Sequence, residues 1–214
     1  RDWLSLCASM ERLHEMGFRD ERFAAVLGRR TLDLGLPLEG RLIGQDGATG
    51  ALYHCCPDHG RHVLVKRAQI ILSTVTTDQP VPVIPDEDKG DMPILGWPEI
   101  HFIGFREHPQ YQSLVLQAVA HPRASIRCQG FEAGIRDLPV TIAQSLLERG
   151  LFDSDEQVRW ASSSAVHGRS DVRWDVERLR CLLQTRKNEA AEHAVETILK
   201  ASLATQPAGA GGSD

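Results

Sequence analysis

Several features that mark whole classes of protein are missing from this chain of 214 residues. It has no run of 18 apolar residues, the length that a membrane-crossing helix requires, so we expect no membrane span. Its first residues, RDWLSLCASM, lack the basic region and the long apolar stretch of a signal peptide. No P-loop, GxGxxG or GxSxG motif occurs, so the common nucleotide and acyl-transfer sites have no support. The chain also begins without methionine, so we expect a fragment or a processed product.

An excess of positive charge is missing too. The net charge is −5, with 12 Lys and Arg against 16 Asp and Glu before His121, and 12 against 13 from His121 onward. Neither part is basic, which argues against nucleic acid as a partner. The cysteines are odd in number and scattered, at Cys7, Cys55, Cys56, Cys128 and Cys181. That pattern fits reduced thiols and a cytoplasmic protein better than a disulfide framework.

Residues 1–78 are expected to form an N-terminal α+β region. Apolar spacing predicts a helix over residues 2–16 and a short second helix over residues 20–27. The apolar runs ALYHC (51–55) and HVLVK (62–66) enclose CPDHGR, which predicts a small β-hairpin with a long turn. Residues 68–76 fit a strand or a buried helix equally well.

Residues 79–110 are expected to connect the two parts of the chain. Five prolines lie between Asp78 and Glu99, with the acidic run Asp86-Glu87-Asp88 among them. Because proline removes an amide donor and disfavours helix in the residue before it, the segment should be extended and solvated. HFIGF (101–105) is a strand candidate at its end.

The character changes at Tyr111, and the remainder is expected to be helical. We predict helices over residues 111–120, 125–135, 139–149, 156–167, 171–185 and 189–204, the fourth of them capped by Asp153-Ser154-Asp155. Residues 205–214 should be a disordered tail.

Three similar helix openings recur along this part of the chain: Ile126-Arg127, Val158-Arg159 and Ala191-Glu192. Their sequence numbers differ by 32 (158 minus 126) and by 33 (191 minus 158). Small residues follow each opening at matching offsets and would let a neighbouring helix come close; after Val158 they are Ala161, Ser162 and Ala165. A single helix pair cannot bury both of its faces, so the pairs are expected to stack.

The segment DEQVRWASSSAVHG resembles the first helix of a HEAT-type repeat, in which an acidic lead-in precedes Val-Arg, small residues and an apolar-Gly end. LPVTIAQSLLERG and VRWDVERLRCLLQT look like partner helices, so the resemblance covers about residues 111–204. It implies a mostly α protein with α-α superhelical repeats and a binding scaffold more often than an enzyme. The third opening has Glu192 where the family has Arg, so an Asp–Arg ladder between repeats would stop there.

Trp174 is the strongest partner-binding candidate from the sequence. If residues 171–185 form one helix, Trp174 would point away from its buried stripe, with Arg178, Cys181 and the adjacent Arg173 beside it, as interface anchors do. The alternative is that Trp174 packs inside the protein. For Trp160 we favour a structural role at the joint between repeats. The stripe would hold Val172, Val176, Leu179 and Leu183.

Metal-capable side chains gather at residues 54–62. Cys56, His59 and His62 could supply three ligands to zinc, but no further pair completes a tetrahedral set. We therefore favour a polar hairpin tip and expect no cofactor, with a zinc site as the alternative.

Three functions follow from these patterns. The first is a non-catalytic protein-binding module, an adaptor or a toxin-neutralising (immunity) protein of bacterial type, for which a basic partner would suit the acidic chain. The second is a metal- or thiol-dependent enzyme that uses the 54–62 cluster. The third is a nucleic-acid-binding helical repeat with a stripe formed by Arg173, Arg178, Arg180 and Arg186.

Overall fold

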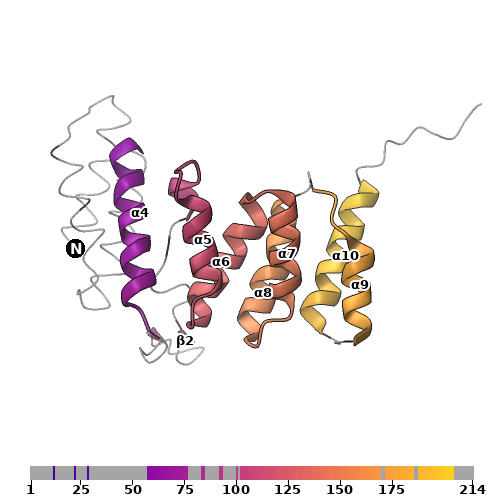
Figure 1. The fold of residues 1–214 in the computed structure, drawn as a ribbon. Coiled ribbons are helices and arrows are strands. Elements are labelled where there is room, and N and C mark those ends of the chain that lie inside the picture. The colour runs from indigo at the N-terminus through magenta and orange to yellow at the C-terminus, as the bar shows by residue number, and fades with distance from the viewer. Residues whose placement is uncertain are drawn as a thin grey trace, which may run out of the picture. The chain divides into compact units, whose positions relative to one another are not determined.

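The structure is a computed structural model that describes residues 57–76, 83–84, 92–93, 100, 102–169, 172–185 and 188–204, together with Arg12, Arg22 and Gly28. The expected helices at residues 2–16 and 20–27, the strand at 51–55 and the tail at 205–214 lie outside this description, apart from those single residues. The chain divides into two compact units, Arg1–Leu114 and Val115–Asp214. The described part of the chain is mostly helical, as the sequence predicts (Figure 1).

In the first unit, α4 (Pro57–Thr74) replaces the predicted hairpin. Proline in the first turn has no amide to satisfy, and Asp58 in the same turn complements the helix dipole. The strand predicted at residues 62–66 is therefore wrong, and the open choice at 68–76 resolves as helix up to Thr74. Buried residues recur at steps of four, three and four, which is a helical period: Leu64, Ala68, Ile71 and Val75.

The strand predicted at residues 101–105 is also wrong, because η1 (Phe102–Phe105) is a 3-10 helix. Side chains three apart lie on one side of a 3-10 helix, so Phe102 and Phe105 are both buried while Ile103 is 62% exposed. The two rings pack against each other with centroids 5.6 Å apart, and Tyr111 meets them edge-on at 6.0 and 5.8 Å. The 3-10 helix lies beside α4.

Two very short strands lie within the proline-rich segment. β1 (Val83–Ile84) pairs antiparallel with β2 (Met92–Pro93), with Val83 opposite Pro93 and Ile84 opposite Met92.

In the described residues of the second unit, five helices follow α5 (Tyr111–Val119), the helix within which the two units divide. The bounds agree closely with the sequence prediction except at α9, which begins five residues later than the predicted start at residue 171. The helices are α6 (Ala124–Asp137), α7 (Val140–Leu151), α8 (Glu156–Ala165), α9 (Val176–Thr185) and α10 (Glu189–Ala204), with the 3-10 helix η2 (Val166–Gly168) directly after α8.

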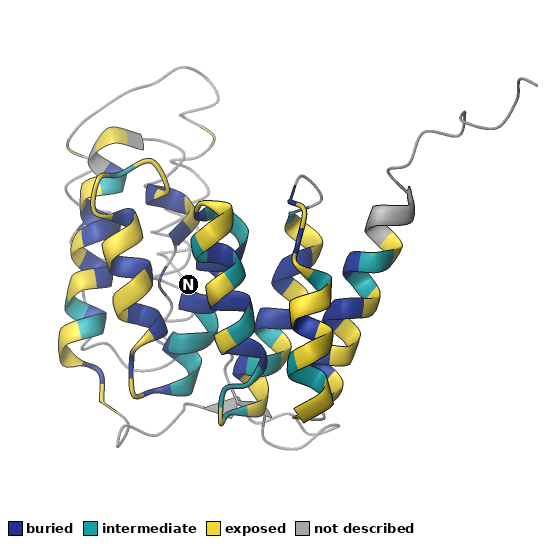
Figure 2. Cartoon of the chain, turned by 45° about the vertical axis from the view of Figure 1, so that its right-hand side comes forward, coloured by how far each residue is buried: buried dark blue, intermediate teal, exposed yellow. Residues whose placement is uncertain are grey.

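The helices of this unit pack in a regular succession. α8 lies against α6 and α7, and α10 lies against α8 and α9 (Figure 1). The three residues that open the similar segments, Ile126, Val158 and Ala191, are all buried, at 0%, 0% and 2% exposure. Figure 2 shows that the helices carry buried residues on one side and exposed residues on the other.

Small residues bring these helices into close contact, as the sequence predicts. A Cβ added to Gly130 of α6 would lie 2.6 Å from the backbone nitrogen of Val119, and one added to Gly150 of α7 would overlap Ser162 of α8. The expected end of α7 at residue 149 is wrong by two residues, because the helix continues through Gly150 to Leu151. Glycine is needed at position 150 because α8 lies so near.

Arg169 fixes the end of α6 from a distant part of the chain. Its Nη1 donates to the carbonyl oxygens of Arg136 and Leu138, both at 2.9 Å, which lie at the end of that helix. A cation at a helix C-terminus satisfies free carbonyls and complements the dipole.

Candidate functional site: a pocket beside Trp160

The sequence leaves Trp174 as a binding residue or as a residue packed inside the protein, and its exposure of only 7% agrees with packing. The exposure expected in the binding alternative is wrong because Trp174 does not belong to a helix. Asp175 caps α9 by accepting a hydrogen bond from the Arg178 N–H at 3.0 Å, so the helix begins after it. The Asp175 N–H donates to Gln144 Oε1 at 3.0 Å, which holds this segment against α7.

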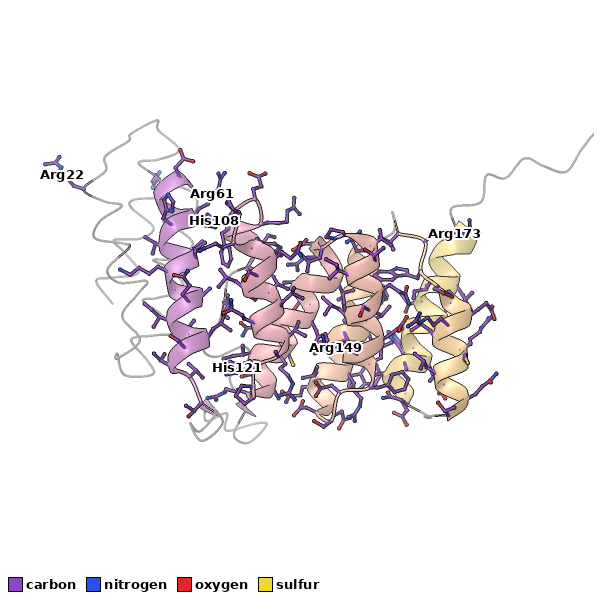
Figure 3. All side chains as sticks on the ribbon, viewed as in Figure 1. Arg22, Arg61, His108, His121, Arg149 and Arg173 are labelled. Carbon is purple, nitrogen blue, oxygen red and sulfur yellow. The ribbon has the colours of Figure 1, made fainter. Side chains whose placement is uncertain are left out.

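The other three predicted partner-binding residues are exposed. Arg173 lies on the segment before α9 (Figure 3). Arg178 and Cys181 lie about one turn apart on α9, and the Arg178 Nε is 2.7 Å from Glu148 Oε1 of α7.

Two arginines of the predicted stripe form ion pairs with neighbouring carboxylates. Besides the pair of Arg178 with Glu148, Arg180 pairs with Glu177 at 2.7 Å. Arg186 lies outside the described residues. Two of the four arginines are therefore engaged within the protein, which weakens the case for a phosphate-binding surface.

The predicted zinc ligands do not form a described cluster. Cys56 lies outside the described residues, while His59 and His62 belong to α4 and not to a hairpin tip. The exposed His62 ring meets His108 edge-on, with centroids 5.8 Å apart. Within the described residues, no group of three or more His, Cys, Asp and Glu side chains could hold a metal ion.

Trp160, which we expected to fill a joint between repeats, is 38% exposed. One side of its ring does meet the next layer, because it contacts the His193 ring of α10 at a centroid distance of 5.6 Å. The His193 ring is itself held by Ser163, whose Oγ lies 3.0 Å from Nδ1. Trp160 is thus a large apolar side chain that is supported on one side and open to solvent on another.

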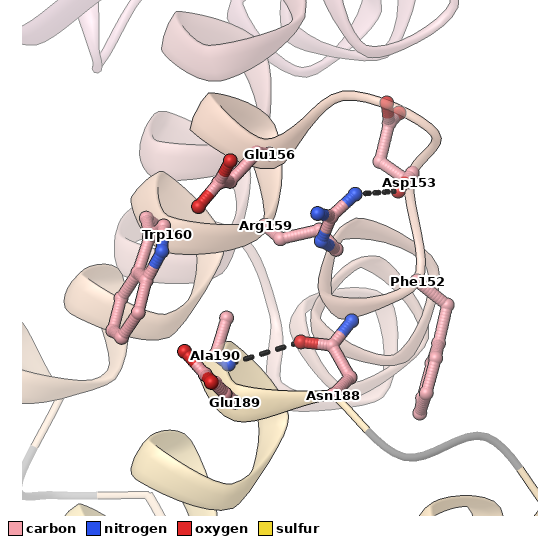
Figure 4. Close-up of a pocket in the computed structure, with 8 residues that line it drawn as sticks. All are labelled: Phe152, Asp153, Glu156, Arg159, Trp160, Asn188, Glu189 and Ala190. Carbon is pink, nitrogen blue, oxygen red and sulfur yellow. Dashed lines mark hydrogen bonds between the residues drawn. The ribbon is translucent and has the colours of Figure 1, made fainter.

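A pocket of about 480 Å³ opens next to Trp160 (Figure 4). Its wall consists mostly of polar groups, and the rings of Phe152 and Trp160 also line it. Three pieces of chain line it: the turn after α7 with Phe152 and Asp153, the start of α8 with Glu156, Arg159 and Trp160, and the start of α10 with Asn188, Glu189 and Ala190.

Hydrogen bonds fix the start of α10 beside the pocket. The Asn188 side chain caps the helix by accepting from the Ala190 and Ala191 N–H groups at 2.9 and 3.3 Å, and its Nδ2 donates to the Leu151 carbonyl at 2.7 Å. Asp155 caps α8 in the same way, accepting from two N–H groups at 2.9 and 3.3 Å. The caps are separated by 33 positions (188 minus 155), which matches the second interval between helix openings.

Arg127 and Arg159 show the same correspondence between layers. Arg127 Nη1 donates to the carbonyls of the residues six and five positions earlier, at 3.2 and 2.7 Å. Arg159 Nη1 repeats this with Asp153 and Ser154 at 3.0 and 3.1 Å. Each arginine thus closes the turn that leads into its own helix.

The two layers differ in what else the arginine meets. At the first junction, where α6 meets α8, Arg127 forms a two-pronged ion pair with Asp153, with Nε–Oδ2 at 3.0 Å and Nη2–Oδ1 at 2.8 Å. At the second junction, where α8 meets α10, the residue 33 positions after Asp153 is Arg186, so the sequence offers no acid there. The pocket lies at this second junction.

The ion pair at the first junction sets the charge of Asp153. Burial alone would raise the pKa of its carboxyl. Hydrogen bonds from Arg127 and from the Asp155 N–H lower the pKa by more than burial raises it, so the net pKa lies below the ordinary value. Asp153 therefore remains a carboxylate wherever ordinary aspartates do.

Cys128, the residue next to Arg127, is not activated. Burial and the negative charge of Asp155 raise the pKa of its thiol to about 12, so this cysteine stays protonated near neutral pH. Cys128 is thus a packing residue and not a nucleophile.

The sequence contains a signal for this site in its outward-facing residues. Trp160 and His193 are separated by 33 positions, as are Glu156 and Glu189, so each pair occupies equivalent positions on successive helices. Matching residues on equivalent positions of stacked helices share one surface. A comparison of the apolar openings alone does not reveal this match.

Family models, curated proteins and solved structures were each compared with the chain, and none matches. Among the described residues, no helix combines the length and apolar character needed to cross a membrane.

Proposed function

We propose that this chain is a non-catalytic protein-binding module, of the adaptor or toxin-neutralising kind, built on HEAT-type helical repeats in its C-terminal part. The observation that carries the proposal is an exposed tryptophan, Trp160, beside a pocket at a joint between successive helical layers. Tryptophan is enriched among the residues that contribute most to protein interfaces, since it buries a large area with little loss of side-chain entropy.

The repeat interpretation is supported by three correspondences between layers. The opening residues are buried at equivalent positions. The caps Asp155 and Asn188 are separated by the same interval as the openings of their helices, and Arg127 and Arg159 bond to carbonyls at the same offsets. In stacked helical repeats the outward positions of successive helices form a continuous surface, which such proteins use for binding.

The proposed binding surface is the outward side of α8, η2 and α10. His167 and His193 lie 6.0 Å apart between ring centroids, so the row of rings continues from Trp160 along the seam between the helices. Glu196 is paired with Lys200 of the following turn at 2.7 Å, so Glu156 and Glu189 are the acids of this surface that suit a basic partner. The exposed residues that we assign to it are Glu156 and Trp160 of α8, His167 of η2, and Glu189, His193, Glu196 and Lys200 of α10.

The test compares Trp160→Ala with Val140→Ala as bait in affinity capture at physiological salt, with captured proteins quantified by mass spectrometry. Val140 is 44% exposed on α7 and does not line the pocket, so it controls for the loss of an exposed apolar side chain. We expect Trp160→Ala to lose specifically bound proteins that Val140→Ala retains, with unchanged circular dichroism. Equal capture by both variants would show that binding does not use this surface.

A further inference from the structure

The pocket beside Trp160 has a chemistry that selects its occupant. We propose that it receives one lysine or arginine side chain from a basic segment of the partner, an inference that rests on the proposed protein-binding function. Three properties of the pocket support this: the balance of charge in its wall, the tryptophan ring and the room available.

One charge in the wall is already paired, and another is hydrogen-bonded to carbonyls without being neutralised. Asp153 is neutralised by Arg127, which lies outside the pocket, at 2.8 Å. Arg159 turns toward the segment before its own helix, where its Nη1 donates to two carbonyls, as Figure 4 shows for Asp153. Asp153 therefore needs no cation from the ligand, whereas Arg159 keeps its positive charge, so the wall sets two carboxylates, Glu156 and Glu189, against one guanidinium.

Glu156 and Glu189 are the groups left for a ligand. Both line the pocket, both are exposed, and neither has an ion-pair partner in the part of the chain that the structure describes. In Figure 4 their side chains are drawn toward the Trp160 ring, whereas Arg159 points toward Asp153. A cation that enters the pocket would be attracted by both carboxylates.

The Trp160 ring adds a second attraction for a cation. Tryptophan is the best aromatic partner for a lysine or arginine, because its face carries a negative potential. The ring is held by His193, and His193 by Ser163, so little entropy is lost when a ligand settles on it. A pocket of about 480 Å³ lies in the range of small-ligand sites and accommodates a long side chain with water.

Helix dipoles offer a simpler reason for the two acids, since Glu156 and Glu189 both lie in first turns. The chain contains a control for this reason. Glu192 also lies in the first turn of α10 and is exposed, but it does not line the pocket. Glu189→Gln and Glu192→Gln remove the same charge from the same dipole, and only the first alters the pocket.

The experiment titrates the full-length protein with a blocked peptide that carries one arginine between glycines, and with the same peptide carrying the neutral isostere citrulline. Binding is followed through the NMR signal of the Trp160 indole N–H, which the variant Trp160→Phe identifies. We expect a saturable shift with arginine and none with citrulline. Glu189→Gln and Glu156→Gln should each weaken binding by about two- to fivefold, the scale of an exposed charge pair, while Glu192→Gln leaves it unchanged.

Three results would overturn the inference: equal shifts with both peptides, an equal loss in Glu189→Gln and Glu192→Gln, or tighter binding of a blocked peptide that carries glutamate. The last would assign the pocket to an acidic ligand of Arg159. If affinity capture depends on Trp160 but not on Glu156 and Glu189 together, protein binding through this surface stands and the basic side chain is excluded.

Discussion

The first and second junctions of the C-terminal unit are built on matching positions, yet one is sealed and the other is open. At the first junction, Asp153 reaches back to Arg127 and joins the turn before α8 to α6. At the second, Asn188 caps α10 in the manner of Asp155, but the wall beside Arg159 remains a pocket. Both junctions thus keep the arginine-to-carbonyl bonds, while the position that corresponds to Asp153 holds Arg186 at the second.

The largest loss of stability is expected from a substitution at the close contact between α7 and α8. In Gly150→Ala the new methyl group would lie 2.8 Å from Ser162 Cβ, and the Ser162 hydroxyl that it also meets is bonded to the Val158 carbonyl at 2.8 Å. The methyl group would also lie 2.9 Å from the Phe131 ring, so neither helix has room to move. We expect a loss of about 3 kcal/mol in the free energy of unfolding, at the upper end for overpacking. Urea denaturation followed by circular dichroism measures it.

Gly168→Ala is the matched control for that change. The nearest atoms to its added Cβ belong to the flexible Arg136 side chain, at 3.4 and 3.6 Å, so stability should hardly change. Removing the Ser162 hydroxyl as well, in Gly150→Ala with Ser162→Ala, should restore part of the loss. A Gly150→Ala protein as stable as the wild type would mean that α7 and α8 are not in such close contact.

The ion pair that seals the first junction is expected to contribute next. Asp153→Asn keeps the shape but removes the charge, and we expect a loss of about 1.5 kcal/mol near neutral pH, the lower end for hydrogen bonds to charged groups. The folded pKa of Asp153 is lowered, so its contribution is present above the unfolded value of about 3.9 and is lost as the pH falls through the folded value.

Denaturation of wild type and Asp153→Asn at neutral pH and below pH ~3 provides the measurement. The stability difference between the two proteins should shrink on acidification. A difference that stays constant with pH would show that Asp153 acts through shape and not through its charge.

The cap at the second junction is expected to have the smallest effect of the three. Asn188→Ala loses both the α10 cap and the bond to the Leu151 carbonyl, and we expect a loss of about 1 kcal/mol. Asn188→Asp keeps the capping oxygen and loses only the donor, so it should retain part of that stability. Thermal unfolding distinguishes the two, and equal melting temperatures for both variants would remove the capping role.

The C-terminal helices could be predicted because several independent signals agreed there. The cap at Asp155, the repeated openings and the small residues near Ser162 all favoured the same layers, and the structure confirms the cap and the burial of Ile126, Val158 and Ala191. Whether these layers form a HEAT-type superhelix stays a prediction.

The sequence misled where a short run fitted two structures. HVLVK has the β-branched residues of a strand, and only the wider window from Leu64 to Val75 shows the helical period. The helix predicted over residues 171–185 begins only after its cap at Asp175, so the prediction placed Trp174 on a helix face that does not exist.

The candidate pocket could not have been located in advance by its residue types. Glu156, Arg159 and Asn188 are ordinary at helix starts, and their convergence depends on how α10 packs against α8. Only the matched spacing of the outward residues pointed there, and it carries no information about an open space between them.

The bonds of Arg169 to α6 bear on the order in which the C-terminal unit opens. They tie the segment after η2 to the end of α6, across more than thirty residues of chain. Together with the part-buried pair of Arg127 and Asp153, they link α6 to the turn before α8 and to the segment after η2, whereas the ion pair that joins α9 to α7, Arg178 with Glu148, is open to solvent on the arginine side. Local opening therefore begins at the outer pair of helices, α9 and α10, and α10 carries part of the pocket. A partner bound there would slow the fraying of these helices.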